Sequence, residues 1–163
     1  MNKIFLLVFV AVVSCTTAQD KKEFTPEALQ DTLLTLEGEH IVFSEILEKY
    51  KGKKIMVEVW ASWCSDCIKG MPDLKELQKQ SSQDVVYLFL SLDRSVDAWK
   101  KGIEKHNLTG AHFFLSSGWK GDFCSAIDLD WIPRYMVVNP QGEIAVYKAI
   151  QATDPTLQNA ILK

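Results

Sequence analysis

The sequence predicts an α/β domain in which a central mixed β-sheet carries helices on both faces. Two apolar runs, 55–60 and 85–90, have the composition of strands that helices cover on both sides. Segments with helical signals precede, separate and follow these runs. Near its end the chain has two more strands, joined by a turn short enough for an antiparallel hairpin, and then a last helix. This order of elements is typical of a mixed sheet between two helical layers.

The first predicted elements are a short helix and a buried strand. Residues 44–50 form the helix, and Ser44 is its expected cap because a serine side chain can accept a backbone N–H at a helix start. The Lys-Gly-Lys sequence at 51–53 ends this helix. The strand 55–60 begins directly after the break.

A longer helix and a second buried strand come next. The helix is expected to begin at Cys64 or Ser65 and to end near Gln80. Pro72 lies inside it and predicts a kink, because proline lacks the N–H that the helix needs. The continuous apolar run 85–90 is the strand that follows.

The middle of the chain has one clear helix and two weaker signals. Ser95 caps the helix, which carries Trp99 and Ile103 on one face. Residues 111–115 are predicted as a short strand and residues 119–128 as an irregular helix.

The C-terminal elements are a hairpin and a helix. Strands are predicted at 135–138 and 144–147, and the Asn-Pro-Gln-Gly sequence at 139–142 is the turn between them. Pro155 then stands near the first position of the last helix, where its missing N–H costs nothing.

The N-terminus predicts export. Lys3 precedes an apolar run at 4–13, and small or polar residues follow it, which is the order of a secretory signal peptide. The run is too short for a membrane span, which needs about 20 apolar residues. We therefore expect a signal peptide at 1–18, a linker at 19–26 and one domain at 27–163.

Two processing rules fit this signal, and the sequence leaves both open. Thr16 and Ala18 suit an ordinary signal peptidase, whereas Val12-Val13-Ser14-Cys15 is similar to a bacterial lipobox that would place a lipid on Cys15. In either case Cys15 is not a cysteine of the fold. Membrane attachment is expected only through such a lipid, since no later run could span a bilayer.

Composition argues against nucleic acid as a partner. The chain has 21 acidic and 18 basic residues, a formal charge of -3, and no basic stripe. About 145 residues remain after the signal peptide, enough for a domain with its own core. The fold therefore does not need its cysteines as staples.

The strongest chemical signal is the run 60–67, Trp-Ala-Ser-Trp-Cys-Ser-Asp-Cys, where a strand passes into a helix. Unpaired backbone N–H groups and the helix dipole favour a thiolate at a helix N-terminus. Two intervening residues place the second cysteine within reach of the first. We expect Cys64 to be the nucleophile and Cys67 to resolve the mixed disulfide.

Two other interpretations of the pair are weaker. A structural disulfide closing so small a loop constrains the unfolded chain little. A zinc site needs two more ligands, and no metal site is predicted because the remaining candidates have no paired ligand spacing. Those candidates are Cys124, which we expect to be a small buried helix residue, and His40, His106 and His112.

Glu58 interrupts an otherwise apolar strand. A buried carboxyl group is costly unless it is paired or protonated, and a raised pKa would let it exchange protons with the resolving cysteine. The alternative is that Glu58 lies at a strand edge and reaches solvent. The pattern alone does not separate the two.

These residues resemble the TlpA/ResA-like thioredoxin family of exported bacterial proteins. The resemblance rests on 60–67, on Met71-Pro72, on Trp131-Ile132-Pro133 and on the position of Glu58, and it extends from about Ser44 to the C-terminus. It implies a thioredoxin fold, an extracytoplasmic or periplasmic location, and thiol:disulfide exchange with protein substrates. It also implies no bound cofactor beyond the redox-active cysteine pair, and an upstream membrane electron donor.

The resemblance also assigns further site residues. It implies that Pro133 follows a cis peptide bond and packs beside the dithiol, and that the backbone of Ile132 pairs with an extended substrate. It favours Glu58 as a buried functional acid. Trp63, next to the nucleophile, is expected to be an exposed platform for partners, whereas Trp60 and Trp99 are expected in the core.

Three departures from the family pattern bear on specificity. Ser65-Asp66 stands between the cysteines, Trp131 replaces a frequent glycine and Arg134 a frequent threonine. A carboxylate at Asp66 disfavours the neighbouring thiolate, which would make the pair a better reductant, and Arg134 would oppose this if it reached the site. The rival functions are a thiol peroxidase, for which the residue set is missing, and a binding or metal-carrier module without catalysis.

Overall fold

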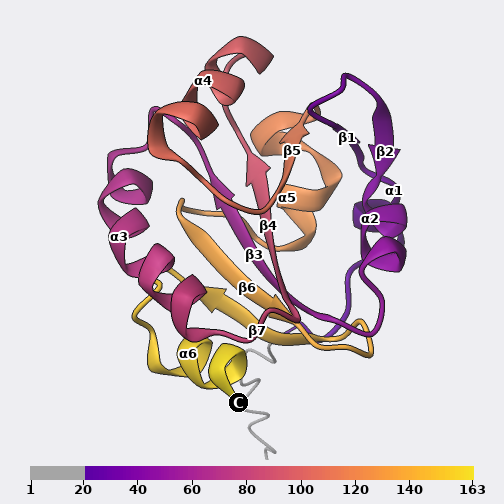
Figure 1. Cartoon of the computed structure of the whole chain (residues 1–163). Coiled ribbons are helices and arrows are strands. Elements are labelled where there is room, and N and C mark those ends of the chain that lie inside the picture. Colours follow the sequence, from indigo (N-terminus) through magenta and orange to yellow (C-terminus); the bar gives the residue numbers. More distant parts are fainter. Residues whose placement is uncertain (1–20) are drawn as a thin grey trace, which may run out of the picture.

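The computed structural model of the chain describes residues 21–163 (Figure 1). The predicted signal peptide at 1–18, both of its processing sites and Cys15 lie outside the described residues. Among residues 21–163, no helix is both apolar enough and long enough to cross a membrane.

The centre of the domain is a seven-stranded mixed sheet in the order β2-β1-β5-β4-β3-β6-β7. β3 pairs with β4, and β4 with β5, in parallel, whereas the other neighbours are antiparallel. This confirms the predicted mixed sheet. The strands are β1 (Thr32–Leu34), β2 (His40–Val42), β3 (Lys54–Trp60), β4 (Val85–Ser91), β5 (Ala111–Leu115), β6 (Arg134–Val138) and β7 (Ile144–Ala149).

Helices cover both faces of this sheet, as predicted. In Figure 1, α3, α4 and α6 lie on one side, and α1, α2 and α5 on the other. Right-handed crossovers from β3 to β4 and from β4 to β5 place α3 and α4 on the same face. The helices are α1 (Pro26–Gln30), α2 (Phe43–Lys49), α3 (Ser65–Gln80), α4 (Val96–His106), α5 (Asp122–Ala126) and α6 (Pro155–Leu162), with a 3-10 turn η1 (Gly118–Lys120) before α5.

The caps agree with the sequence prediction at α4 but not at α2. The Ser95 side chain accepts the Ala98 N–H at 3.2 Å, as expected. Ser44 does not cap α2, because the helix begins one residue earlier, at Phe43. There the Glu45 carboxylate accepts the Val42 N–H at 3.1 Å, which satisfies a donor at the helix start.

The N-terminal part of the domain was not predicted. α1 and the hairpin of β1 and β2 are too short to produce a periodic pattern, since each strand has three residues. The predicted linker at 19–26 also differs from the structure over the residues described. The Lys22 carbonyl accepts the Ile144 N–H at 2.7 Å, and Phe24 packs against Phe43 with ring centroids 4.9 Å apart. The packing of the domain therefore begins before residue 27.

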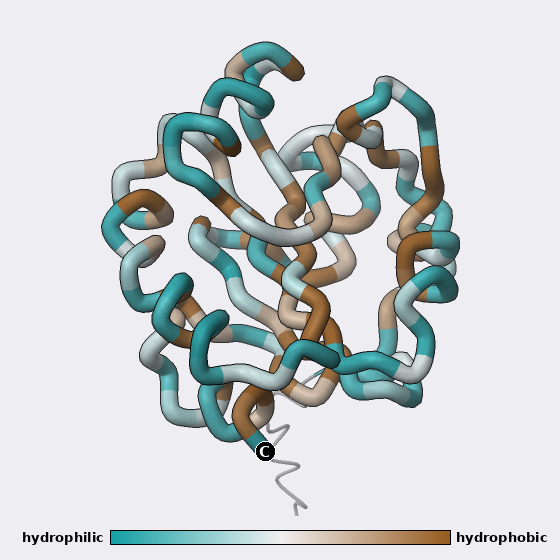
Figure 2. Tube along the Cα trace, in the orientation of Figure 1, coloured by the Kyte–Doolittle hydropathy of each residue, from teal (hydrophilic) through white to brown (hydrophobic). Residues whose placement is uncertain are grey.

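The core lies between the sheet and its two helical layers. Figure 2 shows hydrophobic residues along the strands in the middle of the molecule and hydrophilic residues in the outer turns of the helices. All of β6, and all of β3 after Lys54, is buried. Trp60 and Trp99 are fully buried, which confirms their predicted place in the core. Polar groups on these central strands thus lie out of contact with water.

Candidate active site

The two cysteines of the motif lie where β3 passes into α3. Cys64 is the N-cap residue of α3 and Cys67 is in the first turn, as predicted, and a disulfide joins them with their Cα atoms 5.3 Å apart. The Cys67 N–H donates to the Cys64 sulfur at 3.1 Å. Cys64 keeps 6% of its surface exposed and Cys67 none. Cys64 is therefore the sulfur that a partner can reach, in a place that favours its thiolate.

The loop before β6 lies against this disulfide. The peptide bond between Ile132 and Pro133 is cis, which confirms the expectation from the family resemblance. The Ile132 carbonyl oxygen is 3.5 Å from the Cys64 sulfur. The fold thus brings together Cys64 and Ile132, which are 68 positions apart in the sequence.

The side chain of Glu58 is buried inside the domain. It is 1% exposed, and its Oε1 has no hydrogen-bond partner within residues 21–163. The alternative that Glu58 reaches solvent at a strand edge is wrong, because β3 has a neighbouring strand on each side. Burial raises the pKa of Glu58 to about 8, and the nearby Tyr135 hydroxyl lowers it in part. A carboxyl group of this kind holds its proton at neutral pH and can release it near that range.

The raised pKa of Glu58 predicts that the domain loses stability as pH rises. The carboxyl group titrates near 4.5 in the unfolded chain and near 8 in the fold, so between these values the folded state holds a proton that the unfolded state has lost. Stability from this group is complete below the lower value and is lost as pH rises toward the upper one. The loss over this range is about 5 kcal/mol.

Urea unfolding of the wild type and of Glu58→Gln at several pH values between these limits measures this effect. The amide does not titrate, so the variant is expected to lack this fall in the free energy of unfolding. Parallel pH curves for the two proteins would contradict the prediction.

A buried carboxylate, which the sequence did not reveal, holds the segment before Cys64. Asp93, just after β4, accepts the Ser62 N–H at 3.1 Å and the Ser62 hydroxyl at 2.6 Å, and the Ser91 hydroxyl also donates to it at 2.9 Å. Gly102 on α4 makes room for this segment, since a Cβ there would lie 2.6 Å from the Ser62 Cβ. Asp93 has no motif around it, and only the tertiary fold brings it to Ser62.

Arg134 holds the loop that leads to the cis bond. Its side chain is fully buried and donates to the Ile127 carbonyl at 2.8 Å and to the Asp128 carbonyl at 3.3 Å. It also pairs with the Asp130 carboxylate at 2.5 Å. Arg134 thus fixes residues 127–130 by hydrogen bonds, a role that its place in the sequence did not predict.

Apolar side chains surround the dithiol on the surface. Trp63 is 51% exposed, as predicted, and Trp131 and Ile150 are exposed to a similar degree. Beside them is a cleft of about 370 Å³, which we call the dithiol cleft. It is lined on α3 by Asp66, Gly70 and Asp73, and on the other side by Trp131, Pro133 and Ile150, among others.

Asp66 points away from the core. Its side chain is 46% exposed and pairs with Lys69 at 3.5 Å along the helix surface. The carboxylate therefore faces solvent at the edge of the dithiol cleft, one residue before Cys67.

Cys124 is not part of this site. It is a buried residue of α5, as predicted, and burial raises the pKa of its thiol to about 12. Such a thiol stays protonated and is a poor nucleophile. In the part of the chain that the structure describes, no three His, Cys, Asp or Glu side chains are grouped closely enough to hold a metal ion.

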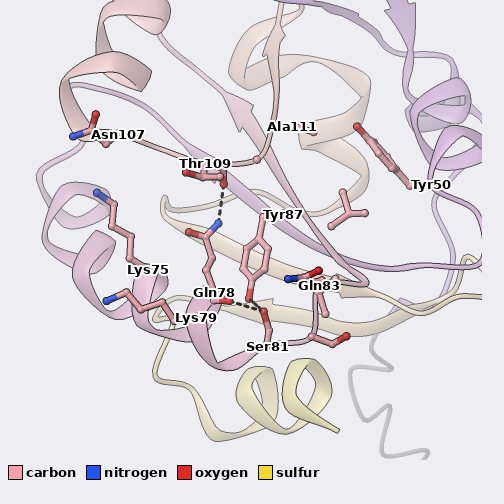
Figure 3. A pocket seen from close by; sticks show the side chains of 14 residues that line it. Tyr50, Lys75, Gln78, Lys79, Ser81, Gln83, Tyr87, Asn107, Thr109 and Ala111 are labelled. Atoms are coloured by element: carbon pink, nitrogen blue, oxygen red, sulfur yellow. Dashed lines mark hydrogen bonds between the residues drawn. The ribbon is translucent and has the colours of Figure 1, made fainter.

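A larger groove, of about 680 Å³, lies at the other end of α3 from the dithiol (Figure 3). It is formed at the end of α3 and the start of β4, whereas the dithiol lies at the start of α3 and the end of β3. Across it the Gln78 side chain donates to the Thr109 carbonyl at 2.8 Å, and the Tyr87 hydroxyl to Ser81 at 3.0 Å. None of the predicted site residues lines this groove.

The family comparison covers most of the chain. Residues 30–161 match the Redoxin family. The chain is 30% identical over 148 residues to the thiol-disulfide oxidoreductase ResA of Bacillus thuringiensis subsp. konkukian, which spans 86% of this chain and 82% of that protein.

Solved structures agree with this. The thioredoxin domain of a thiol-disulfide oxidoreductase from Bacteroides vulgatus superposes with a TM-score of 0.65 at 26% identity, covering 78% of this chain and 87% of that chain. A thiol-disulfide oxidoreductase from Bacteroides fragilis gives a TM-score of 0.66 at 23% identity over 83% of this chain and 99% of that chain. The second likeness shows the fold alone. Together these structures confirm the predicted thioredoxin fold.

Proposed function

The chain belongs to the Redoxin family and is a thiol:disulfide oxidoreductase of the TlpA/ResA-like kind, and from this we propose that it exchanges disulfides with exported proteins through Cys64 and Cys67. The observation that carries the proposal is the Cys64–Cys67 disulfide itself, placed at a helix N-terminus with Cys64 as the more accessible of the two cysteines. No bound cofactor is required, because the cysteine pair stores both electrons.

In the reducing direction the Cys64 thiolate attacks a disulfide of the substrate. One sulfur of the substrate leaves as a thiolate, and Cys64 is left in a mixed disulfide. Cys67 then gives its proton to the Glu58 carboxylate and attacks the Cys64 sulfur, which releases the second substrate thiolate and closes the Cys64–Cys67 disulfide. The dithiol loses two electrons and the substrate disulfide gains them. In the opposite direction Glu58 returns the proton.

Substrate contact is assigned to the surface around Cys64. The Ile132 carbonyl lies beside the sulfur, in position to accept a backbone hydrogen bond from an extended substrate, and Pro133 lines the adjacent cleft. Trp63 offers an exposed apolar surface for the partner. A backbone contact is sequence-tolerant, which suits a protein that acts on several exported substrates.

The proposed direction is reduction, with an electron donor in the membrane that restores the dithiol outside the cytoplasm. The Asp66 carboxylate disfavours a thiolate at Cys64 and so destabilises the reduced pair. Its pairing with Lys69 is exposed and therefore screened, and Arg134 is held at residues 127–130. A measured reduction potential near that of the oxidant DsbA, about -120 mV, would contradict this direction.

Trapping of mixed disulfides tests the proposed function. In Cys67→Ser the resolving thiol is missing, so substrates are expected to remain on Cys64 and to be released by dithiothreitol. The matched control is the double variant Cys64→Ser, Cys67→Ser, which should hold nothing. Equal capture by both variants would refute exchange through Cys64, and mass spectrometry of the trapped proteins names the substrates.

A further inference from the structure

Tyr135 lies beside the buried carboxyl group of Glu58. The two residues are directly opposite each other in the antiparallel ladder of β3 and β6, so their side chains point to the same face of the sheet. Tyr135 is fully buried, and its hydroxyl has no hydrogen-bond partner within residues 21–163. The hydroxyl is nevertheless close enough to Glu58 to lower the pKa of that carboxyl group. Two buried oxygen atoms without partners thus lie near each other.

The Tyr135 hydroxyl also lies against α3, the helix that covers this face of the sheet. It lies 3.3 Å from the point where a Cβ on Gly70 would be, so it touches α3 at a residue without a side chain. Gly70 and Asp73, one helical turn along, line the dithiol cleft. The hydroxyl therefore lies between Glu58 and the α3 backbone at Gly70, which lines the cleft, whereas Tyr135 itself is behind that lining.

Glu58 needs a path for its proton. Each catalytic cycle loads a proton on the carboxyl group and removes it again, yet only 1% of the residue is exposed to water. The charged or titratable groups near this pair are Asp73, an exposed residue of α3 whose charge acts on Tyr135, and Arg134, which precedes Tyr135 on β6 and points to the opposite face, toward residues 127–130. Burial, Glu58 and Asp73 all raise the pKa of Tyr135, so its hydroxyl remains neutral at any working pH.

We propose that the Tyr135 hydroxyl relays protons between the Glu58 carboxyl group and water in the dithiol cleft at Gly70. The inference rests on the proposed role of Glu58. When the carboxyl O–H bond breaks, its proton passes to the Tyr135 oxygen while the hydroxyl proton of Tyr135 leaves toward cleft water. The carboxylate that remains accepts the proton of Cys67 in the next cycle. No electrons move in this step, and the hydroxyl is restored when its bond to the new proton forms.

The test is the pH dependence of insulin-disulfide reduction by Tyr135→Phe, compared with the wild type and Glu58→Gln. The wild type is expected to show an inflection near pH 8, the pKa of Glu58, which Glu58→Gln removes. Tyr135→Phe should keep an inflection but move it to higher pH, because the group that lowered the pKa of Glu58 is gone. It should also lose rate by up to about 10²-fold, the lower end of general acid–base effects.

Tyr87→Phe is the matched control. Tyr87 is a buried tyrosine of β4 whose hydroxyl bonds to Ser81 at the groove of Figure 3, so this variant should keep the wild-type profile. A solvent deuterium isotope effect on the wild-type rate that falls in Tyr135→Phe supports the relay, since a purely structural change would not alter it.

The outcomes separate the two proposals. If Glu58→Gln keeps the wild-type profile, the proposed role of Glu58 fails. If Glu58→Gln loses the inflection while Tyr135→Phe keeps the wild-type inflection, only the relay is overturned. The relay is likewise overturned if Tyr135→Phe loses the same fraction of its rate at every pH and its inflection does not move. If Tyr135→Phe does not fold, a fluorinated tyrosine at position 135 keeps the ring and the hydroxyl but donates more strongly. The inflection should then move to lower pH, and an unmoved inflection overturns the relay.

Discussion

Cys64→Ser is expected to reduce insulin-disulfide reduction to the rate of the buffer. A serine hydroxyl at this position cannot form a mixed disulfide, and neither of the other two cysteines within residues 21–163 can replace it. Cys67 is fully buried, and burial raises the pKa of Cys124 to about 12, so neither offers a partner an accessible thiolate. The measurement is the turbidity of precipitating insulin B chain with dithiothreitol as the electron source.

Cys124→Ala is the matched control for this prediction, because it removes a cysteine outside the site. It should reduce insulin at the wild-type rate. Activity that survives in Cys64→Ser but disappears in Cys124→Ala would place the nucleophile on α5 and overturn the assignment.

Arg134→Ala is expected to destabilise the oxidised protein by about 3 to 5 kcal/mol, through three lost hydrogen bonds, two of them to backbone carbonyls, and a cavity. The Ile127 and Asp128 carbonyls lose their donors, and a buried acceptor left without a partner costs about 1–3 kcal/mol. The long side chain is also fully enclosed, so its removal leaves a void. Urea unfolding with the disulfide kept intact measures the change in free energy.

Lys148→Ala is the control for Arg134→Ala. Lys148 pairs with the same Asp130 carboxylate, but from the surface, where ion pairs contribute little. Its loss should leave both stability and insulin reduction near those of the wild type. If the two variants lost equal stability, the effect would come from Asp130 alone and not from the carbonyl contacts inside the loop.

Local patterns predicted the long elements of this fold well. β3, α3, β4 and α4 each have a continuous apolar run or a helical period with a cap. In these segments the local preference of the residues and the tertiary packing therefore favour the same secondary structure. The pattern failed where elements are short, at α1, β1 and β2, because three to five residues hold no periodicity. It also placed the start of α2 one residue late, where a glutamate and not a serine satisfies the helix start.

The residues of the candidate site also divide into those that local motifs predict and those that they do not. Cys64, Cys67 and Pro133 stand in motifs that adjacent residues define, and the structure places them together at one end of the sheet. Asp93 and Tyr135 stand in no motif. Their contacts with Ser62 and Glu58 join separate strands, and no spacing along the chain contains that information.

The residues alone were enough to predict the long elements, the dithiol and its place at a helix start, because spacing and helix geometry act over a few residues. The burial of Glu58 could be seen only in the folded domain, since solvent access depends on the strands that flank β3 and on the helices that cover it. The same holds for the direction of Arg134, which faces residues 127–130 and not the dithiol. Desolvation and long-range hydrogen bonds depend on which segments surround a group, and distant parts of the chain supply those segments.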